Sequence, residues 1–387
     1  MNILFYFENQ INPQKGGTER VADNIAQELK RRGHGIFYLS RRKVDGEYNV
    51  PCYFLPDIIG NTVLNYSYVK KLITELSIDI IINEGGNTED VYLFSKEYFS
   101  KVKIITHLHF NPLLQYTYFY KSLYLPISIK HPYKSIINLL RRIKAPWNKY
   151  TLLKYMKRRY RYMHDYSDKV ILLAPSYITE YCKIAHINPL KNKCTSIYNP
   201  NTFQKTPNLD KKKNIVLFAG RLTFEQKRVD YLLKVWKIVS NKIKNWELYI
   251  VGDGPDKDRL LEYSKKKHLC NIHFKGFTDI KPFYEKAKIL CLTSIFEGSP
   301  MVIVEAMQNG VVPIVYNTFS ASQYLINNKK SGLIIPPFDA IKYANGMIRI
   351  MTDENLYEEM SKACIESSDR YNLKTIVDIW EKLLQQI

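Results

Sequence analysis

The chain has 387 residues, 45% of them hydrophobic, a composition that excludes a disordered protein and favours two folded domains. No apolar run approaches the roughly 18 residues that a membrane-spanning helix needs, and we expect the first residues to form a buried strand, not a signal peptide. The formal net charge of +20 indicates a polyanionic partner, either nucleic acid or an anionic membrane surface.

Six cysteines are scattered along the chain without a CxxC pair or a zinc-finger spacing. Several lie within apolar runs, as Cys291 does in the segment KILCLTS. We expect free thiols in a reducing compartment, and therefore a cytosolic protein.

Short β-branched segments alternate with helical segments along the chain, which is typical of parallel α/β sheets. Residues 199–213 are polar and contain two prolines, so they predict a linker between two halves. We expect an N-terminal domain over 1–200, a linker over 201–213, a second domain over 214–371, and a final helix over 372–387 that packs back on the first domain. The expected strands are Asn2–Phe7, Gly35–Ser40, Asp79–Asn83, Val102–His107, Lys169–Ala174 and Thr195–Tyr198, then Asn214–Ala219, Glu247–Val251, Asn271–Lys275, Ile289–Thr293, Val312–Val315 and Gly332–Ile335.

Gly16 and Gly17 follow the first predicted strand in the segment GGTERVADNIAQEL, and a helix is expected to begin near Thr18. A glycine pair before a helix leaves free N–H groups that can bind a phosphate. The segment is not GxGxxG, and a plain strand-to-helix turn explains it equally well.

A basic and aromatic stretch separates Glu97 from Asp165, where no acidic residue occurs and fourteen residues are Lys or Arg. Lysine and arginine beside Tyr, Phe, Trp and Leu suit the surface of an anionic membrane. Two other interpretations are a site for single-stranded nucleic acid and a solvated helical face in a Lys- and Tyr-rich protein.

Arg221 and Lys227 follow the predicted strand Asn214–Ala219, in the segment AGRLTFEQK. Ligands bind beyond the carboxyl ends of the strands of an open parallel sheet, so we expect both cations to face the crevice there. A guanidinium and an ammonium suit a diphosphate, whereas a solvated basic loop explains this segment alone equally well.

Glu297 and Glu305 lie eight residues apart in the segment FEGSPMVIVEAMQNG. Ser299 is a good N-cap and Pro300 suits the first helical position, so a helix is expected from there to Gly310. Glu297 then lies in the preceding loop, and Glu305 lies in the second turn, about 7.5 Å along the axis.

Two carboxylates in these positions, together with the backbone N–H groups between Gly298 and Met301, could bind a polyhydroxylated anionic ligand at several points. The different positions of the carboxylates do not favour the acid and nucleophile pair of a glycosidase. A glutamate near a helix N-terminus and a surface glutamate are the ordinary alternative.

Taken together and in order, these segments resemble the retaining glycosyltransferases of family 4. The matching segments span nearly the whole chain, and their ordered set is specific although each one alone is not. They are GGTER, THLHFNP, SIYNPN, AGRL with QK, VGDGP, FKGF and FEGSPMVIVEAM. The resemblance implies an α/β GT-B fold, with two facing Rossmann-like domains of parallel sheet and a donor cleft between them.

The resemblance also implies roles for individual residues. Arg221 and Lys227 would bind the donor diphosphate, Glu297 would bind hydroxyls of the donor sugar, and Glu305 would bind the nucleotide ribose. His109, in THLHFNP, matches the family's active-site histidine, with His107 as the alternative. The predicted catalytic residues are His109, Glu297, Arg221 and Lys227, and the remaining donor contacts are Gly16, Gly17, Gly298, Ser299, Pro300, Met301, Val302 and Glu305.

The mechanism that the resemblance implies is a front-face displacement with retention, in which the leaving diphosphate itself accepts the acceptor's proton. The protein then contributes positioning and electrostatics, not a nucleophile. No DxD triplet stands near the site, and the Arg/Lys pair can neutralise the diphosphate, so we expect no metal and no cofactor beyond the nucleotide-sugar donor.

Many relatives in this family glycosylate lipid-linked acceptors, so the basic stretch, taken over 110–162, is interpreted as a contact with the anionic inner leaflet, and no nucleic acid is expected. The predicted activity is a hexosyltransferase that builds lipopolysaccharide, capsule or a related polysaccharide. The alternatives are a non-catalytic nucleic-acid-binding protein, favoured by the charge, and a sugar-nucleotide epimerase of the same fold.

Overall fold

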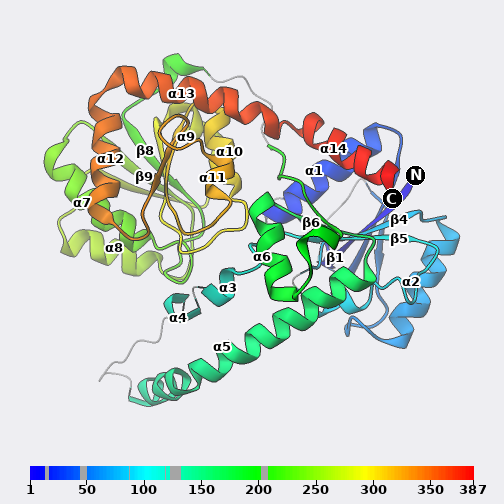
Figure 1. Cartoon of the computed structure of the whole chain (residues 1–387). Helices are drawn as coiled ribbons and strands as arrows, with labels where there is room; N and C mark the ends of the chain where they lie inside the picture. Colours follow the sequence, from blue (N-terminus) through cyan, green and yellow to red (C-terminus); the bar gives the residue numbers. More distant parts are fainter. Residues whose placement is uncertain (14–16, 44–49, 87, 118, 123–131, 202–207) are drawn as a thin grey trace. The chain divides into compact units, whose positions relative to one another are not determined.

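The computed structural model describes residues 1–13, 17–43, 50–86, 88–117, 119–122, 132–201 and 208–387, which fall into two compact units (Figure 1). The first unit comprises Met1–Leu113, Thr151–Thr202 and Tyr371–Ile387. The second comprises Leu114–Tyr150 and Phe203–Arg370. Each unit is built on a parallel β-sheet, as the alternation of strand and helix in the sequence predicts.

The first sheet has seven strands in the order β3-β2-β1-β4-β5-β6-β7, and every neighbouring pair is parallel. Parallel strands need crossover connections, which the helices between them provide. The strands are β1 (Asn2–Asn9), β2 (Gly35–Arg42), β3 (Cys52–Phe54), β4 (Ile80–Asn83), β5 (Lys103–Leu108), β6 (Lys169–Leu172) and β7 (Cys194–Ser196).

Alternate side chains of β1 point to opposite faces of this sheet, and Ile3–Phe7 are buried, so both faces lie within the core at this strand. Leu4 and Tyr6 belong to the core that includes Val69 of α2. On the other face, Phe5 packs edge-on against Tyr38. The helices and 3-10 turns of this unit are α1 (Gly17–Arg31), α2 (Val63–Glu75), η1 (Glu89–Tyr92), α6 (Pro175–Ala185), η2 (Pro189–Lys191) and α14 (Leu373–Gln386). The last part of α5 (Pro132–Tyr166) and the end of η4 (Asp369–Tyr371) also belong to it, whereas both elements begin in the second unit.

The C-terminal helix α14 packs beside α1 in the first unit (Figure 1). Trp380 of α14 is almost fully buried. Arg32, just beyond α1, donates to Asp378 at 2.6 Å and to Glu381 at 2.9 Å. His34 lies 3.0 Å from Glu381 as well, so apolar burial and a small charge network both hold the last helix in place.

The second sheet has six strands in the order β10-β9-β8-β11-β12-β13, again all parallel. They are β8 (Ile215–Ala219), β9 (Glu247–Val251), β10 (Ile272–Gly276), β11 (Ile289–Leu292), β12 (Val312–Tyr316) and β13 (Leu333–Ile335). Helix α7 lies beside α12, and α10 beside α13 (Figure 1). The helical elements are α3 (Leu114–Thr117), α4 (Phe119–Ser122), η3 (Leu209–Lys211), α7 (Val229–Lys242), α8 (Lys257–Lys266), α9 (Lys281–Lys286), α10 (Met301–Gln308), α11 (Ser322–Leu325), α12 (Ala340–Thr352) and α13 (Glu354–Ser368).

All twelve predicted strands are present, and their ends lie within two residues of the predicted ones. The sequence analysis missed β3, a three-residue edge strand that pairs with β2. The structure groups Leu114–Tyr150 with the second unit, whereas the predicted first domain ran from 1 to 200. Most of the first half of α5 is exposed. Of the predicted linker 201–213, residues 202–207 lie outside the described residues.

Burial of Trp380 predicts that the Trp380→Ala variant loses about 3–5 kcal/mol of unfolding free energy, because it leaves a large cavity beneath α14. Ile379→Ala is the matched control on the same helix, because Ile379 is 44% exposed and its loss should change stability by about 0.5 kcal/mol or less. Urea unfolding followed by circular dichroism measures both. Equal effects of the two substitutions would contradict the packing described for α14.

Candidate active site

Each sheet contains one point where the order of its strands reverses. In the second sheet the chain runs from β8 outward through β9 to β10, and then returns to β11 on the other side of β8. In the first sheet the same reversal separates β1 from β4. Ligands of open parallel sheets bind beyond the carboxyl ends of the strands at such a point, so the loops that follow these four strands are the places to examine.

At the reversal of the second sheet, Lys227 and Glu297 form an ion pair. Lys227 lies in the loop after β8, and its Nζ donates to Oε1 of Glu297 at 2.7 Å. Glu297 lies in the loop after β11 and is 5% exposed. The hydroxyl of Ser294 donates to the same carboxylate oxygen at 2.5 Å. The carboxylate is therefore fixed in position by two donors.

Backbone hydrogen bonds join the same two loops. The amide of Ile295 donates to the carbonyl of Gln226 at 2.8 Å. The hydroxyl of Thr293 donates to the carbonyls of Lys227 and Arg228, at 3.2 and 3.0 Å. Arg228 adopts a left-handed conformation with φ of 47° and precedes α7. Lys227 and Glu297 thus sit on loops that support each other.

Arg221 is exposed at the same edge of the sheet, and among the described residues its side chain has no hydrogen-bond or ion-pair partner. The backbone approaches closely beside it. A Cβ on Gly252, whose φ is +138°, would lie 2.0 Å from the carbonyl oxygen of Gly220. Only glycine fits there, because any side chain would displace the loop that carries Arg221.

Glu305 lies in a different environment from Glu297. It is 1% exposed, and the hydroxyl of Tyr284 on α9 donates to its Oε2 at 3.0 Å. The two glutamates of the predicted motif are therefore both buried, one against a cation and one against a phenol. Glu305 is held inside the second unit, in the second turn of α10 as predicted.

The start of α10 differs from the prediction. The helix begins at Met301, one residue later than expected, and Pro300 is its N-cap with a ψ of 109°, outside the helical range. Ser299, the predicted cap, lies one residue before the N-cap and is buried. Gly298 lies directly before Ser299, and Val302 lies in the first turn of α10.

In the first unit, Glu84, His107 and His109 form a buried cluster. Glu84 follows β4, and His107 and His109 lie at the end of the adjacent strand β5. His109 contacts Oε2 of Glu84 through Nε2, and Nδ1 of His107 lies 3.0 Å from the same oxygen. The two imidazole rings are 3.9 Å apart, and Trp380 packs against His107 with ring centroids 5.4 Å apart.

The histidines determine the charge of Glu84. Burial alone raises the pKa of this carboxyl, but the two imidazoles outweigh it and lower the pKa to about 2. Burial, together with His109, lowers the pKa of His107. Glu84 is therefore ionised and can only accept, so Nε2 of His109 carries the hydrogen that faces it. Nδ1 of His109 has no hydrogen-bond partner in the part of the chain that the structure describes.

The same three residues offer one ligand atom each within 4.8 Å of one another, so they are a group that could hold a metal ion. Imidazole and carboxylate together are ligands that zinc accepts. Oε2 of Glu84 already contacts both rings, however, and a metal bound through that oxygen would have to displace these contacts.

Of the other predicted contacts in the first unit, Gly17 is the exposed first residue of α1, and Gly16 lies outside the described residues. His109 belongs to the first unit and Arg221, Lys227, Glu297 and Glu305 to the second. A single catalytic centre built from both units stays a prediction, as do the individual roles of these residues.

The sequence analysis did not find Glu84, Ser294 or Tyr284. A signal for Glu84 existed, because it follows the apolar strand IIIN directly, on the strand that neighbours the one ending in THLH. Carboxyl ends of neighbouring parallel strands meet at one edge. Tyr284 has no such signal, since its contact with Glu305 depends on how α9 packs against α10.

None of the helices in the described ranges is both long enough and apolar enough to cross a membrane.

Two family models match consecutive parts of the chain. The model described as Glycosyltransferase Family 4 matches residues 15–200, and the model described as Glycosyl transferases group 1 matches residues 200–367. The chain belongs to the family 4 glycosyltransferases. The two matches meet at residue 200. Because both models describe glycosyltransferases, the predicted alternatives, a nucleic-acid-binding protein and an epimerase, are not favoured.

Similar proteins include glycosyltransferases of amylovoran and lipopolysaccharide synthesis. An uncharacterized glycosyltransferase of Haemophilus influenzae is 26% identical over 95% of this chain and 96% of its own length. The GalNAc-α-(1→4)-GalNAc-α-(1→3)-diNAcBac-PP-undecaprenol α-1,4-N-acetyl-D-galactosaminyltransferase of Campylobacter jejuni is 30% identical over 49% of this chain and 54% of its own length. The chain is thus a glycosyltransferase of the type that acts in bacterial polysaccharide synthesis.

Solved structures confirm the predicted GT-B fold class. The lipopolysaccharide outer core galactosyltransferase WaaB, in its apo form, matches with a TM-score of 0.71 and 18% identity over the whole of both chains. HepE of Anabaena, in complex with UDP, matches with a TM-score of 0.73 and 17% identity over the whole of both chains.

The contacts of Glu84 predict that the Glu84→Gln variant loses activity without losing its fold. Glutamine keeps the size of the side chain but removes the charge that orients His109, so we expect the turnover of nucleotide-sugar to fall at least about tenfold. The Michaelis constant for the donor and the melting temperature should change little. Glu75→Gln, at an exposed site on α2, is the control. Unchanged turnover in Glu84→Gln would contradict an orienting role.

Proposed function

We propose that the protein transfers a hexose, with retention of anomeric configuration, from a UDP- or GDP-sugar to a lipid-linked glycan. The product would be part of a lipopolysaccharide, a capsule or a related polysaccharide. The observation that carries the donor half of this proposal is the Lys227–Glu297 pair with Arg221 beyond the carboxyl ends of β8 and β11. Its chemistry suits an anionic sugar nucleotide at a site where open sheets bind ligands.

In this proposal each charged group meets a different part of the donor. Arg221 has no protein partner among the described residues and is available to the diphosphate. Lys227 would divide its three hydrogens between the diphosphate and Glu297, while the second oxygen of Glu297 binds sugar hydroxyls. HepE, which shares the fold, has been solved with UDP and with UDP-glucose, which supports a uridine nucleotide as the first donor to test.

The proposed reaction is a front-face displacement in which the leaving diphosphate takes the acceptor's proton. Arg221 and Lys227 would stabilise the charge that builds up on the departing phosphate, so a metal ion is not required. His109, with its hydrogen-bonded Nε2 and open Nδ1, would contact the donor sugar near the reacting carbon, and Gly17 would place its N–H near the phosphates.

The acceptor half of the proposal rests on the exposed face of α5. Ile136, Leu139, Ile143, Trp147 and Tyr150 are all exposed and recur every three or four residues, which places them along one stripe of the helix. Basic side chains flank the stripe, and no acidic residue occurs between Glu97 and Asp165.

An exposed apolar stripe with basic side chains beside it suits an anionic membrane surface. We therefore place the enzyme on the cytoplasmic face of the membrane, beside a lipid-linked acceptor. The Campylobacter relative, whose name includes an undecaprenol-linked glycan, supports an acceptor of that class.

A thermal-shift panel of UDP, GDP, ADP and their sugars tests the donor site. One nucleotide should raise the melting temperature, because a ligand present at about 100 times its Kd adds about 2.7 kcal/mol to the stability of the folded chain. Arg221→Ala should abolish the shift, since it removes the exposed guanidinium. Arg349→Ala, on α12, is the matched control and should leave the shift intact.

With the donor so identified, turnover should survive EDTA, and the anomeric coupling constant of the product should match that of the donor. Loss of turnover on chelation would overturn the metal-independent mechanism, and an inverted anomer would overturn retention. If no nucleotide stabilises the chain, the proposed donor chemistry is wrong.

Sedimentation with lipid vesicles tests the membrane contact. The full chain should bind vesicles rich in phosphatidylglycerol, bind phosphatidylcholine vesicles poorly, and lose binding as salt rises. Ile143→Ser should weaken binding about tenfold, because one large apolar side chain no longer enters the interface. Ile341→Ser is the matched control, since Ile143 and Ile341 are 68% and 66% exposed. Equal weakening by both substitutions, or salt-insensitive binding, would contradict the proposal.

A further inference from the structure

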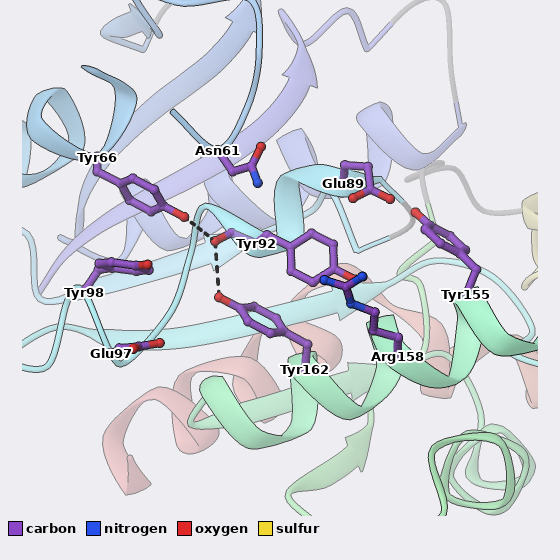
Figure 2. Close-up of a pocket in the computed structure, with 9 residues that line it drawn as sticks. All are labelled: Asn61, Tyr66, Glu89, Tyr92, Glu97, Tyr98, Tyr155, Arg158 and Tyr162. Atoms are coloured by element: carbon purple, nitrogen blue, oxygen red, sulfur yellow. Dashed lines mark hydrogen bonds between the residues drawn. The ribbon is translucent and has the colours of Figure 1, made fainter. Parts of the chain in front are cut away.

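A groove of about 440 Å³ runs along the flank of the first unit, and its lining does not include Glu84, His107 or His109. Five tyrosines line it: Tyr66, Tyr92, Tyr98, Tyr155 and Tyr162, and we refer to it as the tyrosine groove. Its volume lies within the range of about 300–1,000 Å³ that ligand pockets usually occupy. Figure 2 shows Tyr66 and Tyr98 together at one end, Tyr155 at the other end, and Tyr92 between them.

The rings of the tyrosine groove are held in place by contacts within the protein. The hydroxyls of Tyr66 and Tyr162 both donate to the carbonyl of Tyr92, at 2.8 and 3.2 Å (Figure 2). The rings of Tyr66 and Tyr98 are 4.3 Å apart at an angle of 32°. Tyr92 and Tyr162 are 4.7 Å apart at 63°. A ligand that stacks on these rings would lose little free energy in ordering them.

Polar groups stand around the aromatic surface. Glu97 lies at the end with Tyr98, Glu89 lies beside Tyr155, and Asn61 and Arg158 lie along the sides (Figure 2). Burial and a hydrogen bond to Glu89 raise the pKa of Tyr155 to about 12, so this hydroxyl stays protonated as a donor. The groove therefore offers flat apolar rings together with amide, carboxylate and guanidinium groups.

This combination selects among ligand classes. Two carboxylates and one guanidinium give the groove an excess of negative charge within a chain of net charge +20, so phosphate-rich ligands are disfavoured. A lipid tail would leave the carboxylates without water. A pyranose ring suits both the aromatic and the polar groups of the lining. Its C–H face packs on an aromatic ring, and its hydroxyls hydrogen-bond to carboxylates and amides.

The direction of the groove follows from the elements that line it. Glu89 lies just after the carboxyl end of β4, whereas Tyr98 comes five residues before Lys103, where β5 begins at the opposite edge of the sheet. Tyr155 and Tyr162 lie about two turns apart on α5, or about 10 Å. The groove thus runs from the carboxyl edge of the sheet, where Glu84 and His109 lie, back toward its amino edge.

We propose that the tyrosine groove is a remote subsite for a glycan chain, which binds sugar units of the acceptor beyond the unit that is extended. The inference rests on the proposed function, because the glycan it would hold is the acceptor. Tyr98, which is 52% exposed, would provide the stacking surface farthest from the carboxyl edge. Short acceptors would not reach it, and long acceptors would bind more tightly because of it.

Binding of the full chain to an array of bacterial lipopolysaccharide, capsule and teichoic acid glycans tests the subsite without any transfer reaction. We expect the chain to bind at least one array glycan, and Tyr98→Ala to weaken that binding roughly three- to tenfold, the effect of one lost aromatic contact. Tyr98→Phe should retain binding, because stacking does not need the hydroxyl. Tyr263→Ala, at a half-exposed tyrosine of α8 in the second unit, is the matched control.

The outcomes separate this inference from the proposed function. Nucleotide-induced stabilisation should be the same in Tyr98→Ala and the unaltered chain, so its general absence would overturn the donor proposal and leave the groove standing. Absence of binding to every array glycan, or equal binding by Tyr98→Ala and Tyr98→Phe, would overturn the subsite. Preferential binding of a single-stranded oligonucleotide that Tyr98→Ala abolishes would also overturn it.

Discussion

The reversal of strand order next to β1 and next to β8 is the constraint on which the rest of the structure depends. Where connections leave two neighbouring parallel strands in opposite directions, no crossover helix covers their carboxyl ends, and side chains from two distant segments can meet there. Lys227 and Glu297, seventy residues apart, meet in the second sheet. Glu84 and His109 meet in the first, one strand away from its reversal.

Both meeting points bury charge, and burial explains why the groups come in pairs. An unpaired carboxylate as enclosed as Glu84 or Glu297 would be strongly disfavoured or would take up a proton. Lys227 and Ser294 supply the compensation for one carboxylate, and two imidazoles supply it for the other. A ligand that draws Lys227 away must itself offer hydrogens to Glu297, which favours a molecule with both negative charge and hydroxyl groups. A sugar nucleotide has this combination.

The sequence predicts twelve strands to within two residues of their ends. Each of them is a short apolar run that can be recognised without knowing which strand it pairs with. The prediction fails for β3, a three-residue edge strand whose existence depends on pairing with β2. It places α10 one residue early, because Pro300 has an extended ψ of 109° and caps the helix instead of beginning it. Motif residues such as Lys227 and Glu297 could be found from their order in the chain, and Glu84 from its place directly after an apolar strand. The groove tyrosines could not, since their partners are set by packing.

The helix α5 connects the two surfaces that the proposals assign to the acceptor. It is 35 residues long, or about 50 Å at 1.5 Å per residue. Its first half carries the exposed apolar stripe with basic flanks, and its last turns carry Tyr155, Arg158 and Tyr162 of the tyrosine groove. A lipid-linked glycan has a membrane anchor at one end and sugars at the other. Because α5 carries both surfaces, one continuous segment of the chain supplies the proposed membrane contact in the second unit and part of the proposed sugar contact in the first.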